Sequence, residues 1–225
     1  MRHIVHSASL RWAAAVLLLV AGAGCSSGAR KGAAVGAVGG GAVGAVIGHA
    51  TGNTARGAII GAVVGGAAGA IIGEQMDKQA EELKQDIPGA TVSRVGEGIA
   101  VTFASGLLFD FDSDIIRGEA RTNLDALAAN LDKYKDRDLL IVGHTDAVGS
   151  AEYNEDLSIR RAEAAARYLR NRGVNETIQT RGRGEYEPIA SNDTESGRSQ
   201  NRRVEIAIYA SEALRQQALD QAATR

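Results

Sequence analysis

Regularly spaced glycines constrain the fold of this chain more than any other feature of its sequence. They lie in two blocks of 17 residues, 32–48 and 57–73, which are identical at 12 positions. Glycine stands at positions 32, 36, 40, 44 and 48, and again at 57, 61, 65, 69 and 73. A spacing of four places small residues along one face of a helix, where a second helix backbone can approach closely. The repeat therefore predicts helices that pack through glycine ridges.

The two blocks predict a membrane-associated helical hairpin over residues 32–73, with the polar residues 49–56 as its turn. Each block would span about 25 Å at 1.5 Å per residue, which is slightly short for a standard bilayer but sufficient for a thinner one. In water each glycine costs a helix about 1 kcal/mol relative to alanine, so lipid or self-association must stabilise these helices. The alternative is a flexible Gly/Ala linker, which would need neither the strict period nor the repetition.

The first 24 residues have the features of a secretory signal peptide. Arg2 and Arg11 precede the apolar run 12–20, and small residues then lead to Cys25. A short apolar run between positive charges and small residues is typical of a cleaved signal and not of a spanning helix. The segment resembles a bacterial lipoprotein signal, which implies removal of residues 1–24 and diacylation of Cys25. An ordinary cleaved signal with an incidental cysteine is the alternative.

Residues 25–31 would then be a short lipidated tether. In such lipoproteins a residue other than aspartate after the cysteine implies sorting to the outer membrane, and Ser26 stands there. Several acyl chains give stable anchoring, where a single chain is marginal. We therefore expect a lipid anchor in the cell outer membrane, with the globular part facing the periplasm. Because Cys25 is the only cysteine, an intramolecular disulfide and a Cys-rich zinc site are excluded.

Charge divides the chain into two parts. Residues 1–73 carry five Arg and Lys and no acid, whereas residues 74–225 carry 20 basic residues and all 27 acidic ones. The total of 25 basic against 27 acidic side chains excludes a strongly cationic nucleic-acid binder. A basic, apolar N-terminal part therefore precedes an acidic part of ordinary globular composition.

The acidic part predicts an α+β fold, in which two helices pack on a small mixed β-sheet. Residues 74–90 read as a charged helical stalk that Pro88 and Gly89 end, and residues 211–225 as a polar tail. Between them, the domain at 91–210 shows alternation typical of strands and apolar spacing typical of helices. Strands are expected at 91–94, 98–104, 139–142, 179–181 and 203–209, helices at 116–134 and 151–172, and a polar loop at 185–197.

Two charged side chains near the start of the long predicted helix are the strongest candidates for a binding site. Asp146 follows the buried strand, and Arg161 lies about three turns into the helix. A carboxylate can take an ammonium, and the planar guanidinium fork can grip a carboxylate with two hydrogen bonds. The two together would match a zwitterion. The structural alternative is that Asp146 caps the helix while Arg161 makes a surface ion pair.

A longer pattern surrounds these two residues. The run HTDAVGSAEYNEDLSIRRAEAAARY at 144–168, followed by matching segments at 182–185, 192–194 and 197–205, resembles the signature of the outer-membrane protein A (OmpA) C-terminal domain family. That family includes peptidoglycan-associated lipoproteins and flagellar stator proteins, and the resemblance covers about residues 100–210. The glycine repeat resembles the glycine-zipper segment of outer-membrane lipoproteins. With the signal, the whole chain resembles lipoproteins of the YiaD type.

The resemblance implies non-covalent binding of peptidoglycan. In the family, an aspartate and an arginine fifteen residues later hold the diaminopimelate of a stem peptide, and Asp146 and Arg161 stand at that spacing. It implies that residues 201–203 are structural, and that no cofactor or metal is needed. The residues carried over as a peptidoglycan site are Phe111, Asp112, Thr145, Asp146, Asn154, Leu157 and Arg161.

The leading interpretation is a tether between outer membrane and cell wall, with peptidoglycan and the membrane as partners and no catalysis. The alternative is a zipper-driven oligomeric scaffold or pore with secondary wall binding, so self-association stays open. An enzyme is disfavoured: His144 and Asp146 form only a His-x-Asp pair with no later histidine, and His144 suits a packed loop. Asp110 and Asp112 could mimic a glycosidase pair, but they share one strand face with no cleft evident.

Overall fold

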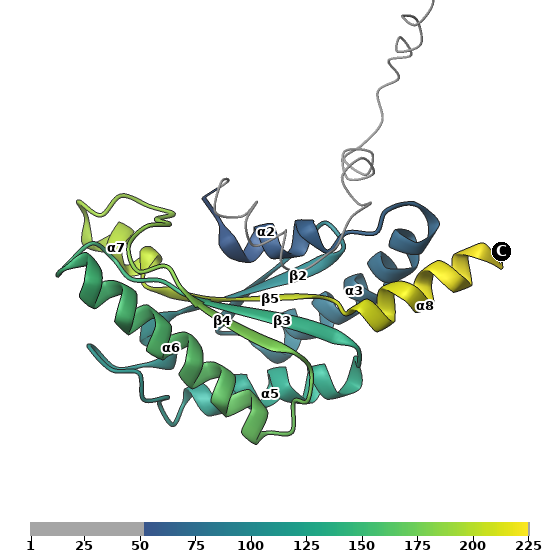
Figure 1. Cartoon of the computed structure of the whole chain (residues 1–225). Helices are drawn as coiled ribbons and strands as arrows, with labels where there is room; N and C mark the ends of the chain where they lie inside the picture. The colour runs from purple at the N-terminus through teal and green to yellow at the C-terminus, as the bar shows by residue number, and fades with distance from the viewer. Residues whose placement is uncertain (1–51, 225) are drawn as a thin grey trace, which may run out of the picture. The chain divides into compact units, whose positions relative to one another are not determined.

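The computed structural model describes residues 52–224 and shows an α+β fold built on one five-stranded sheet (Figure 1). The expected fold class is confirmed. The strands are β1 (Ala90–Val95), β2 (Gly98–Ala104), β3 (Arg137–Gly143), β4 (Ile178–Gly182) and β5 (Arg203–Ala210). The helices are α2 (Thr54–Gly61), α3 (Gly66–Asp86), α4 (Ser105–Leu108), α5 (Ala120–Lys133), α6 (Ala151–Asn171), α7 (Glu195–Asn201) and α8 (Glu212–Ala223).

The sheet is mixed, as the sequence predicts. Its strand order is β1-β2-β5-β3-β4, with β3 and β4 parallel and the other neighbours antiparallel. The expected hairpin of β1 and β2 is present, and Gly96 at its turn has φ +53°, which favours glycine. The parallel pair needs a long crossover, and α6 supplies it.

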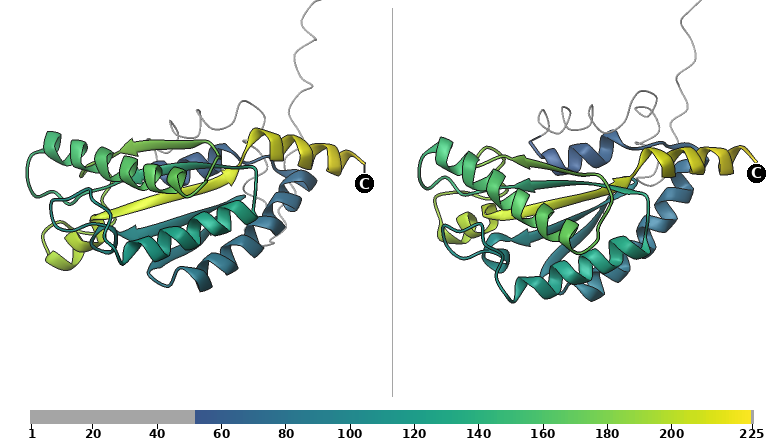
Figure 2. Two further views of the ribbon diagram at one scale, coloured as in Figure 1. Left: turned by 90° about the horizontal axis from the view of Figure 1, so that it is seen from below. Right: turned by 60° about the horizontal axis from the view of Figure 1, so that its bottom comes forward.

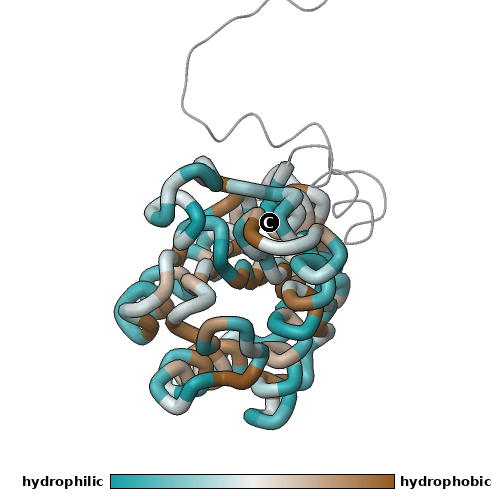
Figure 3. Tube along the Cα trace, turned by 90° about the vertical axis from the view of Figure 1, so that its left-hand side faces the viewer, coloured by the Kyte–Doolittle hydropathy of each residue, from teal (hydrophilic) through white to brown (hydrophobic). Residues whose placement is uncertain are grey.

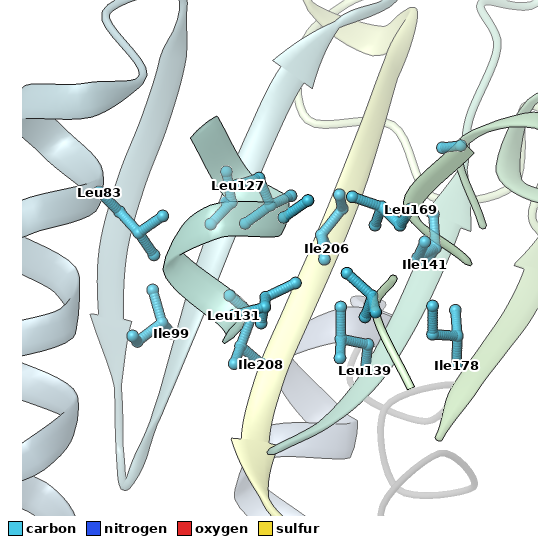
Figure 4. Close-up of a cluster of buried hydrophobic side chains, with 14 of the residues drawn as sticks. Leu83, Ile99, Leu127, Leu131, Leu139, Ile141, Leu169, Ile178, Ile206 and Ile208 are labelled. Atoms are coloured by element: carbon cyan, nitrogen blue, oxygen red, sulfur yellow. The ribbon is translucent and has the colours of Figure 1, made fainter. Parts of the chain in front are cut away.

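The main hydrophobic core lies on one face of the sheet, beneath α3, α5 and α6. Figure 2 shows these three helices across that face. Alternate residues of β2, β3 and β5 point into the core, and Figure 3 shows hydrophobic stretches toward the interior of the trace. Each fully buried Leu or Ile contributes about 1.5–3 kcal/mol. Side chains that meet here are Leu83, Ile99, Leu127, Leu131, Leu139, Ile141, Leu169, Ile178, Ile206 and Ile208 (Figure 4).

The second glycine block divides between the two faces of the sheet. Its α2 part, residues 57–61, packs on the face opposite the main core, whereas Ala68 and Ile72 of α3 belong to the main core. A continuous helix over residues 57–73 was expected, but α2 ends at Gly61 and α3 begins at Gly66. Gly65 and Gly66 between them have φ +76° and +61°, which turns the chain where other residues would be strained. The prediction of one continuous helix is therefore wrong for this block. The sheet supplies the apolar contact that lipid or a second helix was expected to give.

A second, smaller core holds α2 in place. Ala55, Ala58 and Ile59 of α2 are buried against apolar side chains of β2, β3 and β5. Those partners are Ala100, Leu140, Val142, Ala207 and Tyr209. No helix within residues 52–224 is both long and apolar enough to cross a membrane. The predicted signal, Cys25, the tether and the first glycine block lie outside the described residues.

The expected stalk at 74–90 and tail at 211–225 are corrected by the structure, because both belong to the domain. Helix α3 continues to Asp86 and buries Met76 and Leu83 on the core face, so its charged residues occupy only its outer side. Helix α8 buries Leu214 and Ala218 against the main core. Within residues 52–224 the domain thus begins with α2, well before residue 91.

Two further boundaries differ from expectation. The segment 107–114, in which Asp110 and Asp112 were expected to share a strand face, is the end of α4 followed by a loop, with one isolated bridge between Phe109 and Ile116. This loop delays the start of α5 to Ala120. The polar loop expected at 185–197 ends earlier, because Thr194 caps α7 by accepting a hydrogen bond from Gly197 N.

Candidate ligand-binding cleft

A cleft of about 520 Å³ opens at the end of the sheet where β3 leads into α6. Its walls come from the loop after α4, the β3–α6 loop, the first turns of α6, and α7. In Figure 1, α7 and the N-terminal end of α6 lie at this end of the sheet. All seven residues predicted for the peptidoglycan site line this one cleft: Phe111, Asp112, Thr145, Asp146, Asn154, Leu157 and Arg161.

Asp146 is held in the cleft wall by hydrogen bonds to both of its carboxylate oxygens. It is 8% exposed. Its Oδ1 accepts from Val148 N at 3.1 Å, which forms a local turn, and its Oδ2 accepts from Arg202 Nη1 at 2.5 Å. The structural alternative of a helix cap does not hold, because Ser150 caps α6. Asp146 is therefore a fixed negative group at the cleft wall.

Arg202 is a cleft residue that the sequence analysis assigned to structure. Its guanidinium bridges two carboxylates, Asp146 and Glu195, each at 2.5 Å, and it lines the cleft. Its neighbours are structural as expected: Asn201 binds the loop at Ile189 by accepting from its N–H at 2.8 Å, and Arg203 is buried. Adjacent residues of an extended chain point to opposite sides. That alternation is the signal that could have separated Arg202 from Arg203.

Arg161 has a different environment from Arg202. It is 5% exposed, its Nε donates to Ser113 O at 3.0 Å, and its guanidinium carbon lies 5.4 Å from the Phe109 ring centroid. Burial lowers the pKa of Arg161, while the charges of Asp112 and Asp114 act to raise it. No carboxylate of residues 52–224 lies within 4.0 Å of it. Its two Nη groups have no protein acceptor within those residues, so its fork is available for a planar anion.

The cleft has an apolar and conformationally strained rim. Phe111 is 98% exposed and Val148 is 64% exposed, although both line the cleft. Exposed large apolar groups beside a charged cleft are typical of a binding surface. Asp112 has φ +56°, a conformation uncommon for a residue with a side chain and frequent at functional sites.

The other predicted residues form the inner wall. Asn154 is buried, and its Nδ2 donates to Glu185 Oε2 at 2.7 Å. Leu157 is 6% exposed and contributes an apolar surface. The hydroxyl of Thr145 is buried without a hydrogen-bond partner among the described residues. These side chains shape the cleft around the two charged positions.

His144 lies behind the cleft and does not line it. It is fully buried, and burial lowers its pKa well below 6.5, with the charges of Arg203 and Arg183 acting in the same direction. The expectation of a packed loop histidine is confirmed. Asp110 pairs with Arg117 at 3.6 Å. Residues 52–224 contain no group of three or more His, Cys, Asp or Glu side chains placed to hold a metal ion.

The fold and the cleft define the class of protein: a small α+β domain whose open cleft presents both an anionic and a cationic side chain. Comparisons with known proteins place it further. The model of the OmpA family matches residues 108–202, and a model described as a glycine zipper matches residues 35–80. The peptidoglycan-associated lipoprotein of Mesorhizobium japonicum is 36% identical over 125 residues, covering 55% of this chain and 74% of that protein. The chain belongs to the OmpA family.

Other relatives include a lipoprotein and a solved structure. The probable lipoprotein YiaD of Escherichia coli (strain K12) is 35% identical over 136 residues, covering 59% of this chain and 62% of YiaD. The cell wall anchor of the T6SS from Pseudomonas aeruginosa has a TM-score of 0.53 at 31% identity, covering 59% of this chain and 97% of that structure. The chain spans about three fifths of the length of curated relatives such as YiaD.

Proposed function

We propose that this protein binds peptidoglycan non-covalently, through the diaminopimelate of a stem peptide, and tethers the outer membrane to the cell wall. The observation that carries the proposal is the cleft itself, in which a buried arginine with an unused fork and a fixed carboxylate stand on two walls. The names of the relatives agree with this class of ligand. They include a peptidoglycan-associated lipoprotein and a cell wall anchor.

The chemistry of diaminopimelate fits the two charged positions. The free end of its side chain carries an ammonium and a carboxylate on one carbon. The carboxylate would bind the fork of Arg161 by two charge-assisted hydrogen bonds. The ammonium would bind Asp146, whose orientation Arg202 maintains through their ion pair. A lysine side chain has the ammonium alone, so it would leave Arg161 buried and unpaired, which costs binding free energy.

The proposed role is a tether without catalysis, cofactor or metal. Cys25 would carry the acyl chains in the outer membrane, and the domain would face the periplasm. The rival proposal of a zipper-driven membrane scaffold loses one of its two glycine blocks, because α2 and the start of α3 pack within the domain. Only the first block, residues 32–48, then remains for the membrane.

The proposal is tested by titrating the mature full chain in detergent with a diaminopimelate stem peptide and, separately, with its lysine analogue. Arg161→Gln and Asp146→Asn are expected to weaken binding by about ten- to hundred-fold, the range for a charged contact worth about 1.5–3 kcal/mol. Arg160→Gln is the matched control, because Arg160 is an exposed neighbour on α6 that does not line the cleft. Equal affinity of the Arg161 and Arg160 variants, or no binding by the wild type, would refute the proposal.

A further inference from the structure

Residues 183–187 lie between α2 on the back face of the sheet and the cleft at its end; we call them the connecting segment. Its two outer residues contact the first residue of α2. The Glu187 carboxylate accepts from Thr54 N at 3.0 Å and from Thr54 Oγ1 at 2.5 Å. Arg183 Nε donates to the same hydroxyl at 2.7 Å and lies 3.3 Å from Glu187 Oε1. The N-terminal end of α2 is thus fixed to both ends of the segment.

The inner residues of the connecting segment contact the cleft wall. Gly184 O accepts from Thr145 N at 2.8 Å, and Gly184 N donates to Ser158 Oγ at 3.0 Å. Glu185 accepts from Asn154 Nδ2 at 2.7 Å. Thr145 directly precedes Asp146, and both Thr145 and Asn154 line the cleft. Within the connecting segment, Arg183 and Glu187 therefore contact α2, whereas Gly184 and Glu185 contact residues that line the cleft.

The connecting segment has little freedom to change its contacts with α2 without changing its contacts with the cleft wall. A Cβ atom at Gly184 would lie 3.0 Å from Glu155 N, so its backbone already sits close against α6. Thr54 is fully buried and Glu187 is 5% exposed. Arg203 Nη2 also donates to Glu187 O at 3.1 Å, which fixes the backbone of this residue. Buried polar groups left without partners are costly, so undocking of α2 would force the segment to rearrange.

We infer that the connecting segment couples the docking of α2 to the shape of the cleft, and that Thr54, Arg183 and Glu187 are positioning residues for the ligand. They act on Asp146 and Asn154 through Gly184 and Glu185 and do not line the cleft. The inference rests on the proposed function for the identity of the ligand only. It gives the second glycine block a role in wall binding, because α2, which begins at Thr54, includes the first five residues of that block, 57–61.

The test uses the mature full chain with Glu187→Gln, Thr54→Val and the double variant, all close to the native side chains in size. Binding of the diaminopimelate stem peptide is expected to weaken by about two- to thirty-fold, the range for mutations within a coupling network. The double variant should lose no more than the larger single loss, because both changes break one connection. Glu163→Gln is the control: Glu163 is exposed on α6, and within residues 52–224 its one ion pair is with Arg167.

Amide hydrogen exchange gives a second readout that does not need the ligand. In the variants, the Thr145 amide, which donates to Gly184 O, is expected to exchange faster than in the wild type, while amides of the β2–β5 pair stay protected. By linkage, saturating stem peptide should slow exchange in α2 of the wild type. Circular dichroism of the variants confirms that they fold.

The outcomes separate the two proposals. If the wild type binds the peptide, and the variants bind equally tightly with unchanged Thr145 exchange, the coupling is refuted and the proposed function stands. If the wild type does not bind, the proposed function is refuted, and Thr145 exchange in the ligand-free variants alone decides the coupling. Faster exchange supports it, and unchanged exchange refutes it.

Discussion

Two buried arginines at the same end of the sheet differ in their hydrogen bonding: Arg203 lies in a polar cluster inside the fold, and Arg161 lines the open cleft. Arg203 is 1% exposed and Arg161 is 5% exposed. Arg203 donates from all three guanidinium nitrogens, to the Glu205 carboxylate and to the backbone oxygens of Asn201 and Glu187. Among the described residues, Arg161 makes one hydrogen bond, from Nε to Ser113 O.

The difference between the two arginines lies in the hydrogen-bond acceptors that the fold places around each guanidinium. Arg203, Glu205 and Glu187 form a buried group that we call the Arg203 cluster. Helix α2 and the connecting segment cover it, and Asn53 Nδ2 donates a hydrogen bond to Glu205 at 3.3 Å. No part of residues 52–224 supplies a carboxylate to Arg161. A buried arginine whose three nitrogens all have acceptors stabilises the fold, whereas one whose Nη groups have none among the described residues leaves donors free for an anion. The two arginines thus differ in how many of their donor nitrogens have an acceptor within residues 52–224.

The largest expected effect is on stability, from Arg203→Met. The substitution leaves the Glu205 carboxylate buried beside neutral His144 and without its ion pair. Breaking a buried pair by removing one partner costs about 3–5 kcal/mol, so the free energy of unfolding should fall by that amount in urea titration. Arg160→Met is the control on an exposed position. A loss below about 1 kcal/mol would show that the Arg203 cluster is not a structural joint.

The next effect is a pH dependence from His144, whose Nε2 lies 3.9 Å from Glu205 Oε1. The folded state lowers its pKa well below 6.5, so as the pH falls below about 6.5 the unfolded chain binds a proton that the folded chain does not bind until its lowered pKa is reached. Stability is therefore retained above pH 6.5 and falls as the pH decreases, by up to about 1.4 kcal/mol per pH unit. Urea unfolding at several pH values measures this slope, and His144→Gln should flatten it. An equal slope in wild type and variant would contradict the assignment.

The smallest effect is expected for Arg161→Met, the counterpart of Arg203→Met in the open cleft. The substitution removes one hydrogen bond to Ser113 O but also a buried charge that lacks an ion-pair partner among the described residues. Replacing such a charge by an apolar group is often neutral or stabilising, so the free energy of unfolding should change by less than about 1 kcal/mol. Urea titration beside Arg203→Met checks this directly. A loss as large as that of Arg203→Met would erase the contrast between the two arginines.

Much of the fold and the site could be read from the sequence, because local patterns encode them. Period-two alternation identified β1, β2 and β5, apolar spacing identified α5, and an Ala- and Arg-rich run closed by Gly173 identified α6. The resemblance to the family, at 144–168 and at Phe111 and Asp112, identified seven residues that line one cleft. A family pattern can identify such residues from the sequence alone, although they lie far apart along the chain.

The sequence did not determine what the second glycine block contacts. An Ala- and Ile-rich helix suits lipid, another helix or the apolar face of a sheet equally well, since each removes the same surface from water. Only the assembled structure shows that α2 covers the second face of the sheet, where Ala100, Leu140 and Ala207 are buried beneath it. The contacts of α3 and α8 were likewise not predicted, because many charged and polar residues in these segments obscure the apolar residues that each helix buries.

The role of Arg202 was likewise decided in three dimensions. The sequence shows that Arg202 can form an ion pair, but its partner Asp146 lies 56 residues away along the chain. Sequence determined the elements, the charged site residues and the spacing between them, because these depend on neighbours along the chain. The tertiary structure decided which buried arginine has acceptors for all of its nitrogens and which one has none for its Nη groups among the described residues, because that depends on groups that only the fold brings together.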